Sequence, residues 1–126
     1  MQLDLETTIQ EERTFTQAEF GAFAKLSGDD NPIHVDPEFS ARTRFGRTVA
    51  HGMFLYSVVC GVISRHFPGA VQLSQSLMFP APTYADEPMT ISVKMLGQSG
   101  NEAQLLTEMK NHEGTVTFTG EAVILL

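Results

Sequence analysis

Residues 52–67 are the part of this chain that most restricts its fold. They read GMFLYSVVCGVISRHF, and large apolar residues surround a helix of this sequence on nearly all sides. A helix without a polar face has to be buried. The mainly apolar run, 52–63, is about twelve residues long, well below the roughly 20 that cross a bilayer. The segment therefore predicts a buried helix in a globular domain, ended by Arg65, His66 and Pro68-Gly69, and no membrane span.

The sequence after Pro68 alternates apolar and polar residues, which is typical of strands. The turn-forming stretches APTYADEP (81–88) and GQSGN (97–101) separate the strands and indicate an antiparallel meander. We expect one face of each strand to point at the core. The residues in question are Val71, Leu73, Gln75, Leu77 and Phe79; Ile91, Val93 and Met95; the segment 102–110; and Val116, Phe118, Gly120, Ala122 and Ile124.

These elements have to share one core, because 126 residues suffice for a single domain of ordinary size. A curved antiparallel sheet wrapped around the apolar helix buries that helix most economically. We therefore predict a single α+β domain over 1–126 with the hot-dog fold. Long edge strands in such a sheet tend to pair with another subunit, so a homodimer or higher homo-oligomer is expected.

A capped helix precedes the most polar loop of the chain. Thr16 with Glu19 three residues later forms a capping box, and Gly28 lies where a left-handed residue would end the helix. A loop begins directly afterwards, at Asp29. Asp36 followed by Pro37 predicts the start of a second, shorter helix.

The loop reads DDNPIH and brings Asp29 and His34 to within five residues of each other. A carboxylate and an imidazole that face one water or substrate atom can form an acid–base pair. Spacing alone leaves a purely structural interpretation open, in which an Asp caps a turn, Asn31 forms an Asx-turn and His34 is hydrogen-bonded in the core.

Gly52 stands at the start of the apolar helix, directly after His51. Unpaired backbone N–H groups and the helix dipole can stabilise an oxyanion there. The alternative is that glycine merely allows close packing at a helix start.

The stretch SGDDNPIHVDPEFSARTRFGRTVAHGM, followed by QSLMFPAPTYADE, strongly resembles the MaoC-like family, which includes (R)-specific enoyl-CoA hydratases. The resemblance covers nearly the whole chain and rests on D-x-N-P-x-H followed by F-G-R-x-x-A-H-G. It implies that Asp29 and His34 are the catalytic pair, that Asn31 orders the loop and that the Gly52 N–H belongs to the oxyanion hole. His51 is expected to bind substrate or to help order the loop. Asp30 fills a variable position with a second acid, and Cys60 stands where some relatives carry serine.

The resemblance implies a hydro-lyase of fatty acid metabolism that reversibly hydrates trans-2-enoyl-CoA to (3R)-3-hydroxyacyl-CoA. No cofactor is expected, since the CoA thioester is the substrate. A dehydratase acting on (3R)-hydroxyacyl groups of acyl-carrier protein and a hot-dog acyl-CoA thioesterase are the alternatives. The sequence does not assign base and acid, and large apolar residues near the inferred site are candidates for setting acyl-chain length: Leu55, Tyr56, Leu77 and Phe79.

The charge pattern narrows the choice of partners. A net charge of −7 argues against a broad nucleic-acid-binding face, which needs clustered Lys and Arg. Arg42, Arg44 and Arg47 nevertheless lie within six positions. They suit the phosphates of CoA, and Arg47 is taken as the candidate for this contact, but a solvated loop face is the slightly favoured interpretation of the three arginines.

Two further types of site are not favoured by the sequence. His34, Asp36 and His51 have no dedicated metal-ligand spacing, so no metal site is predicted. Cys60 lies within the apolar helix, where thiols are usually packing groups. A single cysteine and an acidic N-terminus without a signal-peptide pattern favour a cytoplasmic location.

Overall fold

The computed structural model describes residues 7–126. The acidic segment 1–6, used above to argue against a signal peptide, lies outside the described residues. The elements along the chain are β1 (Thr8–Thr14), α1 (Gln17–Ser27), α2 (Pro32–Val35), α3 (Pro37–Ala41), α4 (Gly52–His66), β2 (Val71–Gln75), β3 (Pro88–Ser99), β4 (Glu102–Asn111) and β5 (Val116–Leu125).

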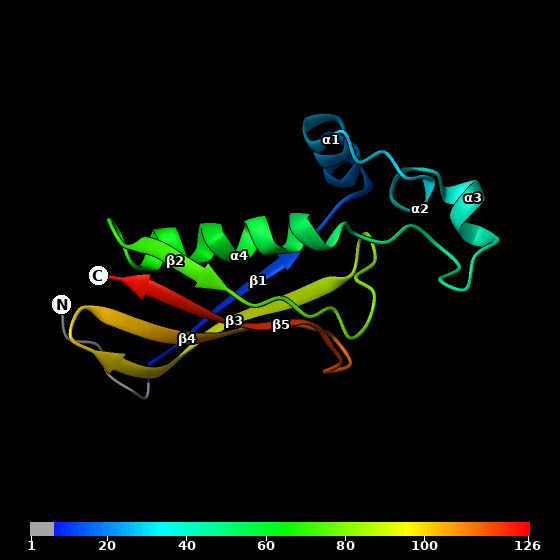
Figure 1. The fold of residues 1–126 in the computed structure, drawn as a ribbon. Coiled ribbons are helices and arrows are strands. Elements are labelled where there is room, and N and C mark those ends of the chain that lie inside the picture. The colour runs from blue at the N-terminus through cyan, green and yellow to red at the C-terminus, as the bar shows by residue number, and fades with distance from the viewer. Residues whose placement is uncertain (1–6) are drawn as a thin grey trace.

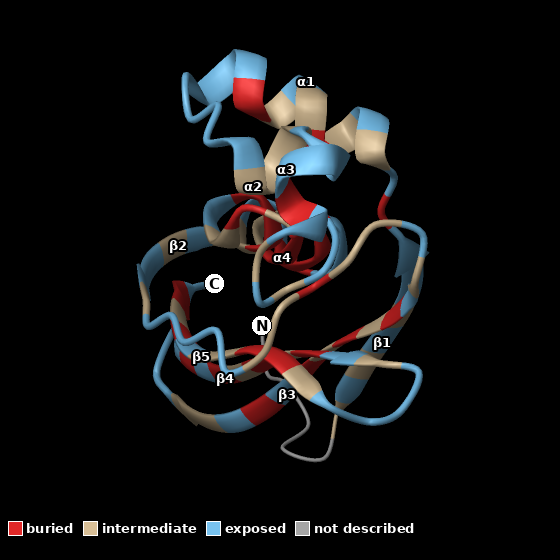
Figure 2. Ribbon diagram, turned by 90° about the vertical axis from the view of Figure 1, so that its right-hand side faces the viewer, coloured by how far each residue is buried: buried red, intermediate tan, exposed pale blue. Residues whose placement is uncertain are grey.

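The five strands form one antiparallel sheet in the order β1-β3-β4-β5-β2. The sheet curves around α4, which lies along its concave side, while α1, α2 and α3 gather beyond the N-terminal end of α4 (Figures 1 and 2). Among the described residues no helix is long and apolar enough to span a membrane. The predicted α+β architecture is confirmed.

The core lies between α4 and the concave side of the sheet. Ile91, Val93, Leu105 and Met109 on β3 and β4 are at most 1 % exposed, in agreement with the alternation in the sequence. The side chains that α4 contributes to this core are Phe54, Leu55, Val58, Val59, Val62 and Ile63.

The prediction that α4 is buried on all sides is wrong for its outer face. Met53 is 54 % exposed, and Tyr56 and Cys60 are only partly buried. The reason is geometric, because the sheet curves around one side of the helix only (Figure 2). On this outer face a hydrogen bond with the Cys60 thiol raises the pKa of Tyr56.

The prediction of one long strand over residues 71–79 is also wrong. β2 ends at Gln75 and contains a register shift, and the following segment stays beside β5 through Ser76, which is hydrogen-bonded to Glu121, and through the isolated bridge between Met78 and Thr119. Val71 and Leu73, expected to face the core, are 53 % and 49 % exposed. Gln72, the residue between them, faces α4 instead, because its amide donates to the Cys60 carbonyl at 3.2 Å and to the Ser64 hydroxyl at 3.3 Å, so Val71 and Leu73 point away from the helix.

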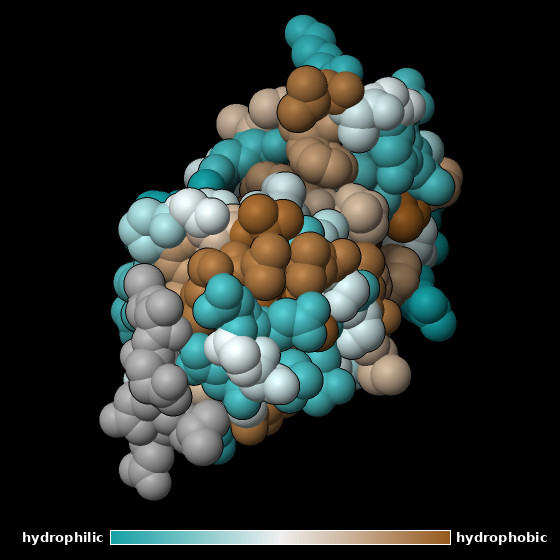
Figure 3. Space-filling model, turned by 60° about the vertical axis from the view of Figure 1, so that its left-hand side comes forward, coloured by the Kyte–Doolittle hydropathy of each residue, from teal (hydrophilic) through white to brown (hydrophobic). Residues whose placement is uncertain are grey.

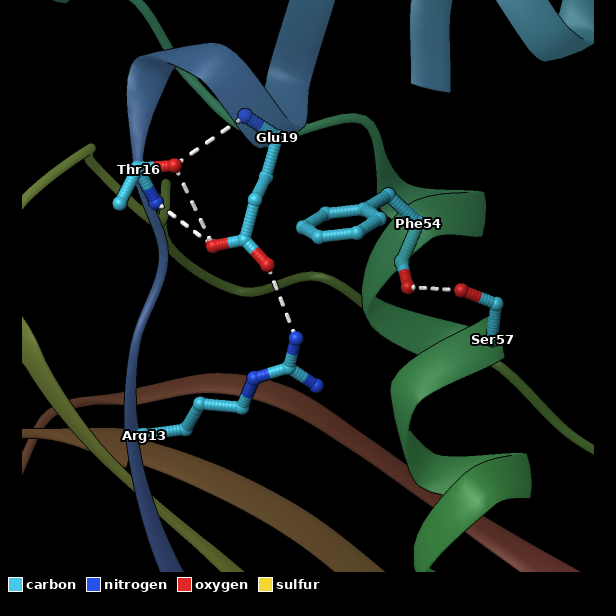
Figure 4. Close-up of polar contacts among 5 residues, drawn as sticks. All are labelled: Arg13, Thr16, Glu19, Phe54 and Ser57. Carbon is cyan, nitrogen blue, oxygen red and sulfur yellow. Dashed lines mark hydrogen bonds and ion pairs between the residues drawn. The ribbon is translucent and has the colours of Figure 1, made fainter. Parts of the chain in front are cut away.

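The predicted capping box at the start of α1 is confirmed. The Thr16 side chain accepts a hydrogen bond from the Glu19 backbone N–H, and the Glu19 carboxylate accepts one from the Thr16 backbone N–H at 2.9 Å (Figure 4). That second bond is the main reason why the pKa of Glu19 lies below its ordinary value. Gly28 ends α1 with a φ of 79°, in the left-handed region that glycine adopts without strain. The chain therefore enters the loop at Asp29 in a fixed direction.

Candidate active site

The loop that was predicted to carry the acid–base pair is partly helical. The Asn31 side chain accepts a hydrogen bond from the Ile33 N–H and caps α2, a single turn with Pro32 at its first position. His34 therefore projects from a helical turn, whereas Asp29 precedes it in the loop. Asn31 orders this segment as the resemblance implied, through a side chain bonded to backbone.

The imidazole of His34 is fixed by a backbone acceptor far along the chain. Its Nδ1 lies 2.7 Å from the carbonyl oxygen of Val49, and the Val49 N–H donates back to the carbonyl of Ile33 at 3.0 Å. A carbonyl oxygen only accepts, so Nδ1 carries the proton. Neutral His34 is thus left with a lone pair on Nε2, the nitrogen that can exchange a proton with a ligand.

Gln17 of α1 strengthens the same attachment. Its side-chain amide donates to the His34 carbonyl at 2.9 Å, and its amide oxygen accepts from the Thr48 hydroxyl. The Gln17 side chain thereby links α1 to the backbone of α2 and to Thr48, which lies in the segment after α3.

His51 lies behind the pair and is 2 % exposed. Its Nε2 is 2.8 Å from the Asp29 carbonyl oxygen, and its ring stacks on His34 with centroids 3.8 Å apart and planes 23° apart. Burial lowers the pKa of His51, and the nearby His34 adds to this effect. His51 is therefore a neutral imidazole, with its Nε2–H given to the backbone of Asp29.

The start of α4 completes this group of residues. His51 is the N-cap residue of α4 but makes no side-chain capping bond, so the first backbone N–H groups, beginning with Gly52, are available to a ligand. A Cβ added to Gly52 would lie 2.6 Å from Cζ of Phe79. The glycine therefore allows close packing against Phe79, and it stands at a helix start without a side-chain cap.

A single cavity of about 760 Å³ joins these groups, and Asp29, His34, His51 and Gly52 all line it. Of the four residues suggested for chain-length selection, Leu55 and Phe79 line this cavity, whereas Leu77 and Tyr56 do not. The cavity wall also includes Arg44, Phe45, Pro80, Pro82, Thr83, Tyr84 and Thr117.

Comparison with known proteins agrees with this geometry. The family model described as "MaoC like domain" matches residues 2–121. The chain belongs to the MaoC-like domain family. It is 39 % identical over 118 residues to the (R)-specific enoyl-CoA hydratase of Aeromonas caviae, covering 90 % of this chain and 88 % of that protein.

Two further comparisons extend this result. The mitochondrial 3-hydroxyacyl-[acyl-carrier-protein] dehydratase of Arabidopsis thaliana is 34 % identical over 123 residues, or 94 % of this chain and 74 % of that protein. The solved (R)-hydratase from A. caviae involved in PHA biosynthesis superposes with a TM-score of 0.94 at 36 % identity, covering 98 % of this chain and 97 % of that one. The predicted hot-dog fold is confirmed for this MaoC-like domain.

The arginines of this MaoC-like domain are not equivalent. Arg44 lines the cavity, with its guanidinium 4.8 Å from the centroid of the Phe45 ring. Arg47 instead forms an ion pair with Glu87 and lies 3.9 Å over the Tyr84 ring. The sequence singled out Arg47, whereas the structure brings Arg44 to the cavity wall.

The metal ligands considered in the sequence do not come together as a set. Asp36 caps α3 by accepting from the N–H groups of Glu38 and Phe39. Asp29, and not Asp36, lies beside the two histidines. Ligand atoms of Asp29, His34 and His51 lie within 4.8 Å of one another. Two ligands on a tetrahedral zinc lie about 3.4 Å apart and point at one centre. His34 Nδ1 is bonded to the Val49 carbonyl and His51 Nε2 to the Asp29 carbonyl, so the ring nitrogens left for a ligand are His34 Nε2 and the buried His51 Nδ1.

Several functional groups were missed by sequence reasoning. The Val49 carbonyl is a backbone group and leaves no mark on residue type. The hydroxyls of Thr83 and Thr117 are buried in the cavity wall, and within residues 7–126 they have no hydrogen-bond partner. An unpaired buried hydroxyl costs about 1–3 kcal/mol, which marks both positions as polar contacts for a ligand. Nothing in the spacing of two threonines in predicted turns and strands could have revealed this.

Proposed function

We propose that this protein catalyses the reversible hydration of trans-2-enoyl-CoA to (3R)-3-hydroxyacyl-CoA. One observation carries the proposal. His34, with Nδ1 bonded to the Val49 carbonyl and Nε2 left as an acceptor, shares a cavity with the Asp29 carboxylate and the uncapped start of α4. A base, a second water ligand and an oxyanion donor are the three groups that addition of water to an enoyl thioester requires.

In the proposed mechanism one water molecule lies between the Asp29 carboxylate and His34 Nε2. The ionised carboxylate accepts a hydrogen bond and orients the water, while Nε2 removes a proton as the oxygen attacks C3. The double bond then shifts its electrons toward the thioester, whose oxygen is stabilised by the Gly52 N–H. The His34 imidazolium returns its proton to C2, so that the reaction adds the elements of one water.

The proposal is tested by following loss of the enone absorbance of crotonyl-CoA in wild type, Asp29→Asn, His34→Gln and the surface control His112→Gln. We expect both site variants to lose about 10²–10⁴-fold in kcat/KM, the usual contribution of a general acid or base. Unchanged circular dichroism should show that they remain folded, and chiral analysis should give the (3R) alcohol. Release of free CoA thiol without hydration would assign a thioesterase instead, and two fully active site variants would refute the pair.

The carrier of the acyl group defines a second candidate. The relative from A. thaliana named as an acyl-carrier-protein dehydratase matches 94 % of this chain, and the chemistry is the same with a different thiol. Comparing kcat/KM for crotonyl-CoA and for crotonyl-acyl-carrier protein in one assay decides between them. The free CoA thioester is expected to be the better substrate.

The proposed contact with the CoA phosphates gives a graded prediction. Arg44→Ala should raise the KM for crotonyl-CoA several-fold, since one exposed charge contact contributes up to about 1 kcal/mol. Arg47→Ala should raise it less, because Glu87 already pairs with that guanidinium. An unchanged KM in both variants would remove the arginines from CoA binding.

We propose that no metal or organic cofactor takes part, because the residues of the cavity supply every proton transfer. Prolonged dialysis against EDTA should leave kcat unchanged, and a loss restored by added zinc would contradict the proposal.

We also place the protein in the cytoplasm, where CoA thioesters are used and the single thiol, Cys60, stays reduced.

A second copy of the chain is the proposed occupant of the exposed apolar face. Figure 3 shows a band of apolar side chains on the side of the molecule that carries β2, where Val71, Leu73 and Leu125 are exposed. Exposed apolar patches of this kind mark interfaces. Light scattering should give twice the monomer mass of 13.9 kDa, or a higher multiple, and a monomer at micromolar concentration would contradict the proposal.

A further inference from the structure

We propose that His51 is a positioning residue, which holds the Asp29 backbone and the His34 ring in the geometry needed for proton transfer. The inference rests on the proposed function and assigns a role to a residue other than Asp29, His34 and Gly52. His51 follows Asp29 by 22 positions and His34 by 17, so its contacts are tertiary.

The first contact fixes the backbone at Asp29. The His51 Nε2–H donates to the Asp29 carbonyl at 2.8 Å. Other hydrogen bonds at this residue are weaker or local, since the Asp29 N–H donates to the Ser27 hydroxyl at 3.1 Å and Oδ1 accepts from the Asn31 N–H at 3.4 Å. The bond from His51 therefore joins an exposed loop residue directly to the start of α4.

The second contact sets the plane of the His34 ring. The Val49 carbonyl fixes Nδ1 but leaves the imidazole free to rotate about that bond. Stacking on His51 at 3.8 Å removes this freedom and directs Nε2 along one line. The edge contact between His51 and Phe23, with ring centroids 4.9 Å apart, supports the stack from the other side.

The protonation state of His51 fits this role. A carbonyl partner requires the proton on Nε2, which leaves Nδ1 unprotonated, buried and without a hydrogen-bond partner among residues 7–126. Burial lowers the pKa of His51, so the ring stays neutral. A positive charge there would oppose the charge that His34 acquires when it takes a proton from water.

Other roles fit these contacts less well. The His51 ring forms part of the cavity wall, but its Nε2 is already bonded to the Asp29 carbonyl, so only the buried Nδ1 is left for a contact with substrate. Although His51 is the N-cap residue of α4, its side chain makes no capping bond to the helix. Its backbone does continue into Gly52, so the residue that orients the pair also adjoins the proposed oxyanion donor.

The ring proton is tested directly in the wild-type protein. Long-range proton–nitrogen NMR of ¹⁵N-histidine-labelled protein should show His51 protonated on Nε2 and His34 protonated on Nδ1. His51 protonated on Nδ1 would overturn the proposal, because its bond to Asp29 could not exist. This measurement needs no variant and does not depend on whether crotonyl-CoA is hydrated.

The functional consequence is tested with two variants that each keep one contact. His51→Gln places an amide donor near the Asp29 carbonyl but removes the stack, and His51→Phe keeps a stacking ring but removes the donor. We expect kcat to fall about 10-fold in the first and about 100-fold in the second, with KM nearly unchanged, because misplacement by about 1 Å costs on the order of 10²-fold. His112→Gln is the matched control and should match wild type.

The outcomes separate the two levels of the proposal. Wild-type hydration together with full activity in both His51 variants would overturn the positioning role while leaving the proposed function intact. Absence of wild-type hydration would overturn the proposed function, and the NMR tautomers would then still decide whether His51 holds Asp29. A rise in KM with kcat unchanged would assign His51 to substrate binding and overturn the positioning role.

Discussion

The main part of α4 and its N-terminus lie in different surroundings. Along most of its length the helix packs on the sheet through apolar side chains such as Val59, Val62 and Ile63, all 0 % exposed. Around its N-terminus, α1, α2 and residues 49–51 are joined by hydrogen bonds to backbone carbonyls, and Phe54 of α4 packs on Phe20 and Phe23 of α1. The contact between α4 and the sheet is held by burial of apolar side chains, which is strong and does not depend on the exact direction of each contact. The site region is held by hydrogen bonds, which are weaker in sum but fix atoms in place.

This difference separates stability from precision. Removing apolar volume from the helix–sheet region should lower the free energy of unfolding and leave the proton-transfer geometry unchanged. Removing one hydrogen bond or adding one atom in the site region should disturb the proton-transfer geometry and change the free energy of unfolding little. The following substitutions test this separation in order of expected effect.

Leu105→Ala on β4 should have the largest effect on stability. Leu105 is 0 % exposed, and truncation of a buried leucine costs about 2–5 kcal/mol. Urea unfolding should show this loss, while kcat of the folded fraction stays at the wild-type value. A fall in kcat with unchanged stability would show that the two regions are not separable.

Gly52→Ala should have the largest effect on activity among these backbone and packing variants. The new Cβ would lie 2.6 Å from the Phe79 ring, so either the ring or the helix start has to move, and displacing one oxyanion donor costs about 10²–10³-fold. Adding Phe79→Ala should restore much of the rate, and steady-state kinetics of the double-mutant cycle measures that coupling.

Gly61→Ala is the matched control in the same helix, since only the flexible end of Arg65 lies near its added Cβ, at 3.3 Å. We expect it to retain full activity. Equal losses at both glycines would assign the effect to the helix and not to the oxyanion donor.

Glu11→Gln on β1 should have the smallest effect, confined to stability. Glu11 is bonded to Arg65 and His66 at the far end of α4, and chiefly the His66 hydrogen bond lowers its pKa below the ordinary 4.5. A depressed folded-state pKa stabilises the fold above the unfolded pKa, and this contribution disappears as pH falls through the folded value. At pH 7 the variant should be less stable by under about 1 kcal/mol, and urea titrations should show the difference disappear as pH falls below 4.5 and through the lowered folded-state pKa.

Much of the fold could be predicted because it depends on local pattern. Thr16 with Glu19 marks a helix start, the apolar run marks α4, and the alternation of Ile91, Val93 and Met95 marks β3. The outward-facing residues of β2 were assigned to the core because alternation shows that a strand has two faces, not which face the sheet covers. The face of β2 that meets α4 is the one that carries Gln72, and this choice is set by tertiary contacts with the helix.

The candidate site was predictable in its side chains but not in its supports. Asp29, His34 and Gly52 came from the motif, and all three line one cavity. The two carbonyls that fix the histidine tautomers belong to Val49 and Asp29, and any residue type offers such an acceptor. The choice of Arg44 over Arg47 likewise depends on Glu87, which follows Arg47 by forty positions.

The strand order β1-β3-β4-β5-β2 has a consequence for the sequence of folding events. β3, β4 and β5 are consecutive along the chain and form a local meander, whereas β1 joins its edge only after the chain closes a loop of more than seventy residues. Local pairings form early and distant ones late, so the meander should form first and β1, with α1 behind it, should dock afterwards. In the native state the same hierarchy should make the Asp29 loop exchange its amide hydrogens well before the β4 amides do. A molecule that has lost its proton-transfer site can therefore still hold most of its sheet.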